Sequence, residues 1–549
     1  MSTNVSRTAT PYRGPDLAGQ AGAATRGGLS RPGTPLSDED YKDIQGLVRF
    51  GYAHLKAARF HLLTIADASS ARAWLSRAPV TSAVKHTPPE VALNVALTHG
   101  GLAALGTQTD VLAQFPYEFI SGMNERSRSR RLGDVGANDP QWWRWGGSGE
   151  KKIPHVLVMT YATTDERLAQ FEAEVMDSNW KSGFATLTSL STKDIGDIEP
   201  FGFNDGISQP VIDWERQVGK RHDTAEYTNI SALGEVLLGY PNEYGKYTNR
   251  PLVDPPDDFG NLLPPAEDAP EMRDLARNGT YLVLRDLVQD APAFWHSVNT
   301  QAAEERQSVD RAAAATVGRV PFDVPAEPVS DTYVPHTTTP HDKPPGTPLA
   351  PLSSVAIPGV GENATDAQLN QFTFHSDRNG DACPYGAHIR RANPRNADLP
   401  QGTRGLFAWF LRTLGFGREH PHDDLIASTR FHRILRRGRE YVIEASDDHG
   451  APTVQRGLRF ICLNANISRQ FEFIQTSWLA FPKFEGLDEG DPLLGTRTPM
   501  LAGRATDTFT RSHNNGVCSR SGPLPQFVRV VGGAYFFLPS LPALRYLSR

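Results

Sequence analysis

The chain has 549 residues, of which 39% are apolar and 21% are charged, and its formal net charge at neutral pH is −6. This length is enough for about two to four domains with a sizeable core, and the ordinary composition indicates a folded globular protein. The charges are spread along the chain without a basic stripe of interleaved aromatic residues, which argues against a nucleic-acid partner.

The N-terminal stretch, residues 1–42, lacks an apolar core segment and a twin arginine, so we expect a disordered tail and not a signal peptide. No apolar run in the sequence is long enough to cross a membrane. Three cysteines, Cys383, Cys462 and Cys518, are too few for a disulfide framework and match no zinc-ligand spacing. These features predict a cytoplasmic protein without a membrane partner.

Alternating strands and helices are expected from about Asp43 onward. Strand-like runs that lead into helix-like runs recur at residues 57–78, 90–105 and 155–175. Asp67 or Ser69 is expected to cap the first of these helices, and Thr163 and Glu166 have the spacing of a capping box for the third. Short connections between the runs predict an α+β architecture in which helices cover one face of a sheet.

The C-terminal half repeats this pattern after a polar stretch at residues 215–275. Strands are expected at residues 279–287, 431–438, 457–465 and 527–540. Helices are expected at residues 290–316 and 468–479. Between them, residues 321–358 are dense in proline and threonine, which predicts an extended loop.

Asp205 lies between glycines in the stretch GFNDGISQP, residues 202–210. Taken alone, it is most simply a turn residue, because Asp beside Gly favours turns. The functional alternative is an acid–base carboxylate beside a flat ligand, because glycines lack a Cβ and let a ligand approach the backbone.

His388 follows two small residues and precedes three arginines, Arg390, Arg391 and Arg395. A single histidine is more often structural than a ligand. The small neighbours and the cations would nevertheless suit a planar ligand that carries carboxylates, although the arginines could equally form a solvated face.

Two further patterns lie on expected strands. Arg436 and Arg437 are adjacent, so one of them points inward and the other toward solvent, and an inward arginine needs an anion or a developing negative charge. Leu458 and Phe460 lie two residues apart and therefore share one strand face, where periodicity alone makes them core residues.

These patterns together resemble a known family. The motifs are, in chain order, GFNDG at 202–206, CPYGAHIR at 383–390, ILR at 434–436 and GLRF at 457–460. Their composition and order resemble the dye-decolorizing peroxidases, larger bacterial and fungal branch. Further similar segments are DIQGLV at 43–48, NGTYLVLRDL at 278–287, QFEFIQTSW at 470–478 and GGAYFFLPS at 532–540.

The resemblance implies an α+β fold of two ferredoxin-like domains, each an antiparallel sheet with helices, with haem in the C-terminal domain. The expected organisation is a tail at residues 1–42, an N-terminal domain at 43–225 and a C-terminal haem domain at 226–549. An insertion near 396–428 lengthens the gap that the family usually has between its histidine and arginine motifs.

The resemblance also implies roles for individual residues. His388 would be the axial ligand of the iron in one non-covalent haem b per chain. Asp205 and Arg436 would lie on the peroxide-binding side, and Leu458 and Phe460 would pack the same pocket. The sequence has no Cys-x-x-Cys-His motif for covalent haem attachment.

Two assignments stay open in the sequence. Arg437 competes with its neighbour Arg436 for the role at the peroxide side. The family usually supplies a carboxylate partner for the axial histidine, and Glu472 is the nearest candidate in the sequence.

The implied function is a haem peroxidase that uses hydrogen peroxide to oxidise dyes, phenolics or other one-electron donors through a ferryl intermediate. The alternative is a haem-binding, haem-trafficking or iron-releasing protein without peroxidase turnover, and a haem-free interaction protein is a third possibility. The expected partners are peroxide and a small-molecule or dye reductant, without nucleic acid or membrane, and an oligomer is possible.

Overall fold

The structure, a computed structural model, describes the greater part of the chain. The described residues are 33–321, 372–394, 427–497 and 506–549, apart from gaps at 86–87, 150–151, 194–197, 207–208, 218–229, 373, 375–376, 378, 447–451 and 513–517. The expected tail therefore lies outside the described residues up to residue 32. Its last residues enter helix α1 (Asp38–Asp43), which Ser37 caps, so regular structure begins before the expected boundary at residue 43.

The N-terminal half contains four long strands and three helices that pack on them. They are β1 (Ala57–Ile65), α3 (Ala68–Leu75), β2 (Val91–Leu97), β3 (Val156–Ala162), α8 (Asp165–Val175), α9 (Ser178–Gly183) and β4 (Phe184–Ser191). The strands are antiparallel and lie in the order β2-β3-β1-β4. The strand and helix starts expected for this half are confirmed, and Asp67 is the residue that caps α3.

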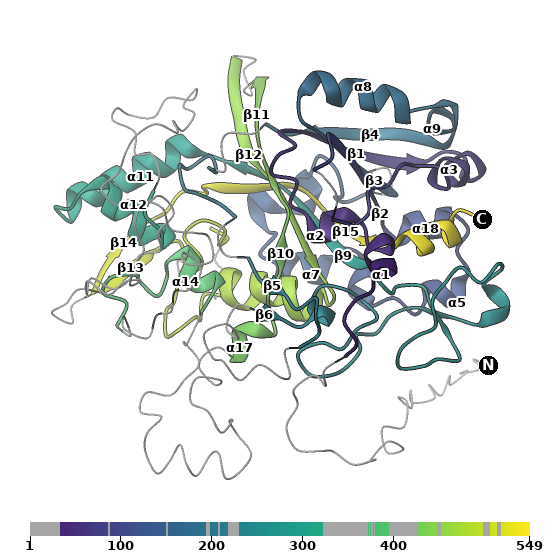
Figure 1. The fold of residues 1–549 in the computed structure, drawn as a ribbon. Coiled ribbons are helices and arrows are strands. Elements are labelled where there is room, and N and C mark those ends of the chain that lie inside the picture. The colour runs from purple at the N-terminus through teal and green to yellow at the C-terminus, as the bar shows by residue number, and fades with distance from the viewer. Residues whose placement is uncertain are drawn as a thin grey trace, which may run out of the picture.

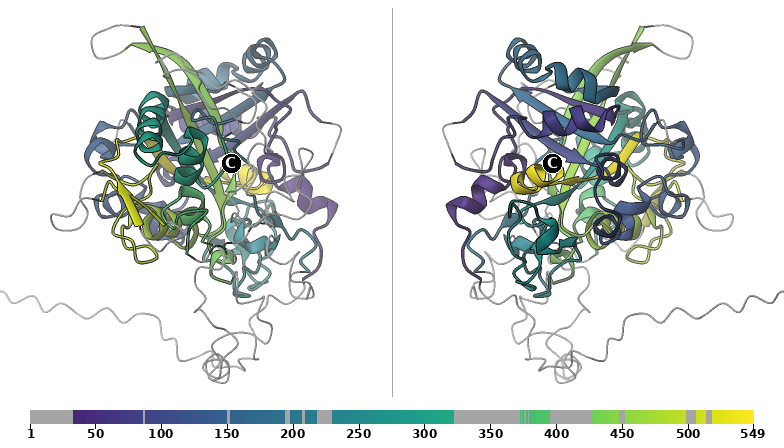
Figure 2. Two further views of the ribbon diagram at one scale, coloured as in Figure 1. Left: turned by 90° about the vertical axis from the view of Figure 1, so that its left-hand side faces the viewer. Right: turned by 90° about the vertical axis from the view of Figure 1, so that its right-hand side faces the viewer.

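The C-terminal half has strands β9 (Thr280–Gln289), β10 (Leu435–Arg436), β11 (Arg439–Ser446), β12 (Pro452–Asn464) and β15 (Val528–Leu538). Its helices are α11 (Ala291–Glu304), α12 (Val309–Val317), α14 (His388–Ala392), α17 (Ala427–Arg430), α18 (Leu541–Leu547) and two π-helical segments, Ser468–Glu472 and Ile474–Ala480. The strand order is β10-β12-β9-β15, and β11 also pairs with β12. The ribbon of β11 and β12 projects beyond the rest of the sheet (Figures 1 and 2).

Shorter elements connect these strands and helices. They are α2 (Gly46–Arg49), α4 (His99–Ala104), α5 (Thr109–Leu112), α6 (Tyr117–Ser121), α7 (Arg126–Arg131), β5 (Val211–Ile212), β6 (Ile230–Ser231), β7 (Leu252–Val253), β8 (Arg273–Asp274), β13 (Phe509–Ser512) and β14 (Cys518–Ser521).

Both halves have the same strand arrangement. If the four strands of each half are numbered along the chain, their order in the sheet is 4-1-3-2 in both halves. This is the ferredoxin-like arrangement, and the expected α+β fold of two such units is confirmed. The halves meet where Phe537 of β15 pairs with Leu97 of β2, so one continuous sheet runs through both. Figure 1 shows α3, α8 and α9 at one end of this sheet and α11, α12 and α14 at the other.

The core covers both faces of the sheet. In β3, Val156 and Val158 belong to one buried cluster and Leu157 and Met159 to the other, as the twofold alternation of a strand requires. Both β3 and β9 are buried over their whole length, as strands covered on both faces are. This differs from the expectation that helices cover one face only.

Two local expectations are wrong. Helix α8 is capped by Thr164, whose side chain accepts a hydrogen bond from the Arg167 N–H, so Thr163 and Glu166 do not form a capping box. The helix expected at 290–316 is two helices, α11 and α12, separated by a turn in which Arg306 has a φ of 53°. A positive φ in a residue other than glycine is incompatible with a continuing α-helix.

The two inserted stretches lie almost wholly outside the described residues. Of the expected loop at 321–358 only Pro321 is described, and of the insertion near 396–428 only the first two residues of α17. The domain boundaries therefore stay predictions.

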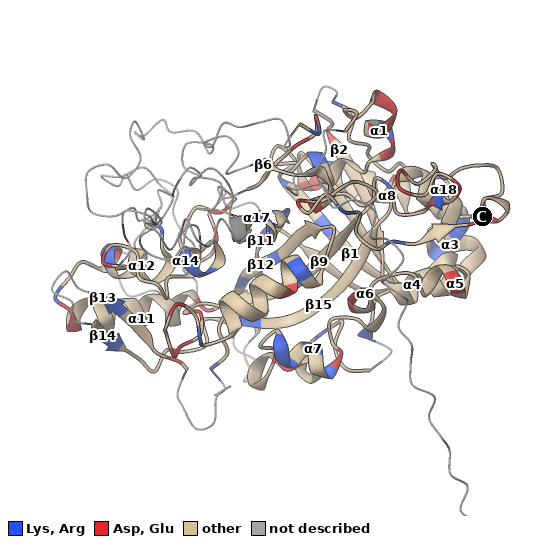
Figure 3. Ribbon diagram, turned by 90° about the horizontal axis from the view of Figure 1, so that it is seen from below, with Lys and Arg blue, Asp and Glu red and all other residues tan. Residues whose placement is uncertain are grey.

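Residues of both charges are spread over the fold (Figure 3). In this view blue and red residues occur on neighbouring elements, and α7 gathers four arginines in the sequence RSRSRR. Among the described residues, the structure contains no helix with the length and apolar character of a membrane span.

Candidate active site

A cavity of about 270 Å³ lies against one face of the C-terminal part of the sheet. Its walls come from β9, β12 and β15, from α14, from the loop after residue 198 and from the π-helical segment at 474–480. The five residues expected to form the site all line this cavity, and they are Asp205, His388, Arg436, Leu458 and Phe460. The structure thus brings together residues that the chain separates by more than 250 positions.

His388 is the first residue of α14, and its imidazole is held by a buried carboxylate. Its Nδ1 atom lies 3.1 and 3.0 Å from the two carboxylate oxygens of Asp491. One of these oxygens also accepts the backbone N–H groups of Leu493 and Leu494 at 2.9 and 2.8 Å. Because an ionised carboxylate only accepts hydrogen bonds, Nδ1 carries the proton, and Nε2 keeps the lone pair that a metal ligand needs.

The electrostatics of this pair reflect the mutual attraction of the imidazole and the carboxylate. Burial raises the pKa of Asp491, but the charge and hydrogen bond of His388 bring the pKa below its usual value. Burial lowers the pKa of His388, but the neighbouring carboxylate raises it by more, and the net direction is upward. The pair therefore places an anion behind an imidazole that faces the cavity.

Glu472, the carboxylate that the sequence suggested for this role, lies elsewhere. It forms an ion pair with Arg128 at 2.6 Å and accepts the hydroxyl hydrogen bond of Tyr535 at 2.9 Å. The partner of His388 is Asp491, which sequence reasoning missed. The two residues are 103 positions apart, and the stretch GDPLLG around Asp491 has no pattern that points to a histidine.

Asp205 and Arg436 form an ion pair in the cavity wall. A guanidinium nitrogen of Arg436 lies 2.5 Å from a carboxylate oxygen of Asp205, which also accepts the Gly206 N–H at 2.7 Å. The two side chains keep 28% and 27% of their surface exposed, so both stay accessible to a small molecule. Burial raises the pKa of Asp205, but Arg436 and the Gly206 N–H bring the pKa below its usual value.

The glycines beside Asp205 are required by the backbone. Gly202 and Gly206 have φ angles of 96° and 85°, a region that other residues rarely adopt. A Cβ at Gly206 would meet no atom within 4 Å, so conformation and not space explains this glycine. The glycines thus fit the conformational part of the turn interpretation, which is compatible with a functional carboxylate.

Glu199 anchors the start of the same loop. Its carboxylate accepts the N–H groups of Phe201 and Phe203, both at 3.0 Å, and the side-chain amide of Gln289 at 2.7 Å. Burial raises the pKa of Glu199 to about 7, with Asp205 adding a smaller upward contribution. Sequence reasoning missed Glu199, although it lines the cavity.

Arg437 points away from the cavity. Its guanidinium donates hydrogen bonds to the carbonyls of Leu47 and Val48 at 2.8 and 3.0 Å. The alternation of a strand thus separates the two arginines, and Arg436 is the one at the cavity. The competing assignment of Arg437 is wrong.

Leu458 and Phe460 face the cavity from β12. Across the sheet they pair with Leu287 and Arg285 of β9, which line the cavity as well. Arg459 lies between them in sequence and pairs with Asp286 on the other face of the sheet. The shared face expected from their spacing is confirmed, and these side chains form a cavity wall and not only a packed core.

The arginines after His388 do not face the cavity. Arg390 donates to the Asp377 carboxylate and to the Cys383 carbonyl, at 3.1 and 2.7 Å. Arg391 donates to three backbone carbonyls, and both side chains are buried. They are structural anchors for α14, neither cofactor contacts nor a solvated face, and Arg395 lies outside the described residues.

A second imidazole, His432, also lines the cavity. Its ring stacks on Phe473 at 3.7 Å and contacts the Trp478 ring edge-on. Its Nδ1 lies 2.5 Å from the carbonyl of Arg469, and burial lowers the pKa of the ring. Within the described ranges no carboxylate is seen to contact His432, which distinguishes it from His388.

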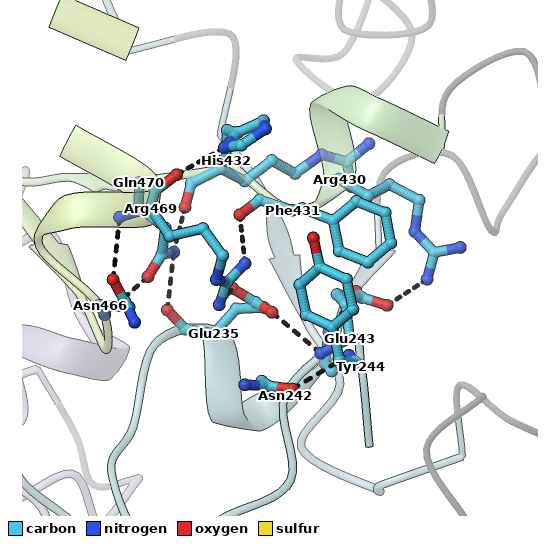
Figure 4. A network of polar contacts seen from close by, with 12 residues as sticks. Glu235, Asn242, Glu243, Tyr244, Arg430, Phe431, His432, Asn466, Arg469 and Gln470 are labelled. Carbon is cyan, nitrogen blue, oxygen red and sulfur yellow. Dashed lines mark hydrogen bonds and ion pairs between the residues drawn. The ribbon is translucent and has the colours of Figure 1, made fainter. Parts of the chain in front are cut away.

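Buried ion pairs hold the segment that leads to Arg436 (Figure 4). Arg430 pairs with Glu243, and Arg469 pairs with Glu235 at 2.7 Å. Arg469 also donates to the carbonyl of Phe431, in the same segment. Removal of one partner of a buried ion pair destabilises a fold by several kcal/mol. The network therefore stabilises the position of the cavity wall.

A smaller polar pocket of about 110 Å³ adjoins the main cavity. Asp205, Gln209 and Arg436 line both spaces, so these three side chains lie between them. Lys56 and Glu440 contribute charged groups to the smaller pocket.

The cavity fits a planar iron cofactor such as haem. Its apolar walls suit a macrocycle, His388 offers a neutral nitrogen ligand, and Asp205 and Arg436 offer an acid–base group and a cation. Some buried polar atoms of lining residues have no hydrogen-bond partner among the described residues, for example Oδ2 of Asp134, Nη1 of Arg285 and Oε1 of Gln289. Among the residues described, no cluster of three or more His, Cys, Asp and Glu side chains has the arrangement of a bare metal site.

Comparison with known proteins points to one family. The chain is 28% identical to a dye-decolorizing peroxidase of Mycetinis scorodonius over 573 aligned residues. This alignment covers 99% of this chain and 93% of the relative. It is also 28% identical to a multifunctional dye peroxidase of Amycolatopsis sp., over 83% of this chain and 82% of the relative. Over most of its length the chain is thus similar to dye-decolorizing peroxidases. No protein-family model matches it.

Solved structures support this similarity at the level of the fold. The DyP-type peroxidase of Anabaena sp. superimposes on this protein with a TM-score of 0.64 at 21% identity, over 96% of this chain and all of that chain. The Amycolatopsis sp. enzyme gives a TM-score of 0.61 at 23% identity, over 94% and 99% of the two chains.

Proposed function

We propose that this protein is a member of the dye-decolorizing peroxidases and a haem peroxidase that uses hydrogen peroxide to oxidise dyes, phenolics or other one-electron donors. The names of the relatives support the peroxidase reaction expected from the sequence. The proposal rests on one observation: two side-chain pairs lie at the same cavity. They are the imidazole–carboxylate pair of His388 and Asp491 and the ion pair of Asp205 and Arg436.

The cofactor would be one non-covalent haem b per chain. His388 would bind the iron through Nε2, and Leu458 and Phe460 would pack against the macrocycle. When bound, the haem supplies the iron that reacts with peroxide and passes oxidising equivalents to the reductant.

Asp205 and Arg436 would act on the peroxide. A carboxylate whose pKa lies below its usual value is ionised at neutral pH, so Asp205 accepts a proton from peroxide and returns it to the departing oxygen. Arg436 keeps its positive charge at every working pH and stabilises the negative charge that develops on that oxygen. A positioned charge of this kind is worth roughly 3 kcal/mol of the activation barrier.

The imidazole–carboxylate pair would tune the cofactor. Asp491 holds the proton on Nδ1 of His388 and increases the electron donation of the ring. This favours the ferric state that peroxide attacks.

One absorption experiment tests the function and separates it from the haem-trafficking alternative. The purified protein should show the Soret band of ferric haem, and one equivalent of peroxide should shift that band within seconds, followed by its return when a dye or phenol is added. Bound haem that peroxide leaves unchanged would support the trafficking alternative, and a colourless protein that takes up no hemin would contradict both. The comparisons give no support to the trafficking alternative.

The location and the oligomeric state stay predictions. Cell fractionation with an antibody tests the cytoplasmic location, and light scattering of the purified protein tests whether it forms an oligomer.

A further inference from the structure

Gln209 makes a reciprocal pair of hydrogen bonds with the backbone of Arg436. Its side-chain amide nitrogen donates to the Arg436 carbonyl at 3.0 Å, and the Arg436 N–H donates to its side-chain oxygen at 3.0 Å. One side chain thus satisfies both backbone groups of the residue that carries the cavity cation. Gln209 lies four positions after Asp205, in the same loop.

This pair of bonds acts like an additional strand beside β10. On its other side β10 pairs with β12, where Arg436 lies opposite Cys462 and the Arg437 N–H donates to the Ile461 carbonyl at 2.8 Å. Strand β10 has two residues and is the last strand of the sheet path on this side, so among the described strands none pairs with its outer edge. Gln209 takes that edge position at Arg436.

The loop of Asp205 is consequently held at two points. Glu199 fixes its start through the N–H groups of Phe201 and Phe203. Gln209 fixes its end by binding the backbone of Arg436, the residue whose guanidinium pairs with Asp205. Because Gln209 is only four positions after Asp205, its hold on Arg436 limits how far the carboxylate can lie from the guanidinium.

We propose that Gln209 is a positioning residue for the reaction with peroxide. It sets the separation of the Asp205 carboxylate and the Arg436 guanidinium, and it acts through their backbone. The inference rests on the proposed peroxidase function, because it assigns a purpose to the pair within that reaction.

The test compares Gln209→Leu with a matched control, Gln45→Leu. Gln45 holds Val95 in the same manner, since its amide donates to the Val95 carbonyl at 2.8 Å and its oxygen accepts the Val95 N–H at 3.0 Å. Gln45 lies in the N-terminal half and does not line the cavity. Both substitutions remove an amide clamp of the same kind, and only one of them is at the site.

Three quantities are measured on the haem-loaded proteins: the second-order rate constant for peroxide, the dissociation constant of cyanide and the thermal midpoint. Cyanide binds ferric haem as an anion, so displacement of the Arg436 cation should weaken cyanide binding. This affinity can be measured without the peroxidase reaction. We expect Gln209→Leu to lower the rate constant and the cyanide affinity by about tenfold each, with unchanged haem content. Gln45→Leu should lower the thermal midpoint and leave cyanide affinity unchanged.

A second variant, Gln209→Glu, keeps the acceptor for the Arg436 N–H and loses the donor to its carbonyl. We expect it to weaken cyanide about threefold, and it decides the question if Gln209→Leu does not retain haem. Wild-type cyanide affinity and peroxide rate in the Gln209 variants would overturn the inference. A wild-type protein that binds haem but does not react with peroxide would instead overturn the proposed function.

Discussion

The partner of the axial histidine gives the most direct test of the site. Asp491→Asn preserves the size of the side chain and its oxygen acceptor for the Leu493 and Leu494 N–H groups. The amide nitrogen, however, would face Nδ1 of His388 and donate where the carboxylate accepts. The imidazole would then carry its proton on Nε2, the atom that should bind iron.

The structure indicates the size of this effect. The variant loses one buried, charge-assisted hydrogen bond, which is the contact of His388 Nδ1 with both oxygens of Asp491 at 3.0 and 3.1 Å. Such a bond contributes about 1.5–3 kcal/mol, and loss of an outer partner usually weakens a metal site about 10–100-fold. Since a tenfold change corresponds to about 1.4 kcal/mol, the two figures agree.

We expect Asp491→Asn to release haem to excess apomyoglobin about 10–100-fold faster than the wild type. The substitution should weaken the binding of ferric haem more than that of ferrous haem. Each tenfold difference between these two losses of affinity raises the reduction potential by roughly 60 mV. Glu472→Gln is the matched control, because Glu472 contacts Arg128 and Tyr535 and not His388. Haem release and potential equal to wild type in Asp491→Asn would refute the reasoning.

Four further outcomes are expected. His388→Ala should lose haem and the ferric spectrum, while His432→Ala should retain both, and the reverse result would move the ligand to His432. Arg436→Leu should slow the reaction with peroxide about a hundredfold in stopped-flow measurements, with normal haem content. Because Arg436 holds the pKa of Asp205 below its usual value, the peroxide rate should fall only at a pH below the usual range of an aspartate. In Arg436→Leu that fall should begin at higher pH, and a rate that rises steadily to pH 9 would contradict the base assignment. Removal of haem should lower the thermal midpoint, since a ligand at a thousandfold excess over its dissociation constant stabilises a fold by about 4 kcal/mol.

Features that depend on neighbouring residues were predictable from the sequence. The alternation in β1 and β12 and the apolar run of β9 predicted those strands, and the spacing of Leu458 and Phe460 predicted a shared face. The repeated strand–helix pattern likewise predicted an α+β fold, because each element carries its own period.

Contacts between distant residues could not be predicted in this way. Asp491 meets His388 across 103 positions, and Gln209 meets Arg436 across 227. Neither pairing has a local period, and each depends on where the sheet and its loops place the chain. Arg390 and Arg391 show the reverse case, since a cluster of cations beside the ligand histidine binds backbone carbonyls and a buried carboxylate and not the cavity.

The two ferredoxin-like halves differ in what covers the sheet, and this difference explains why only one of them holds the site. In the N-terminal half α8 packs directly on the sheet, and its Glu172 reaches His61 of β1 at 2.9 Å. In the C-terminal half the cavity lies beside β9 and β12, where Arg285 and Phe460 face it. The short helix α14 supplies His388 to this space in place of a long helix with a bulky apolar face. Such a short helix leaves room for the cavity beside the sheet, and this is where the proposed cofactor would bind between His388 and Arg436.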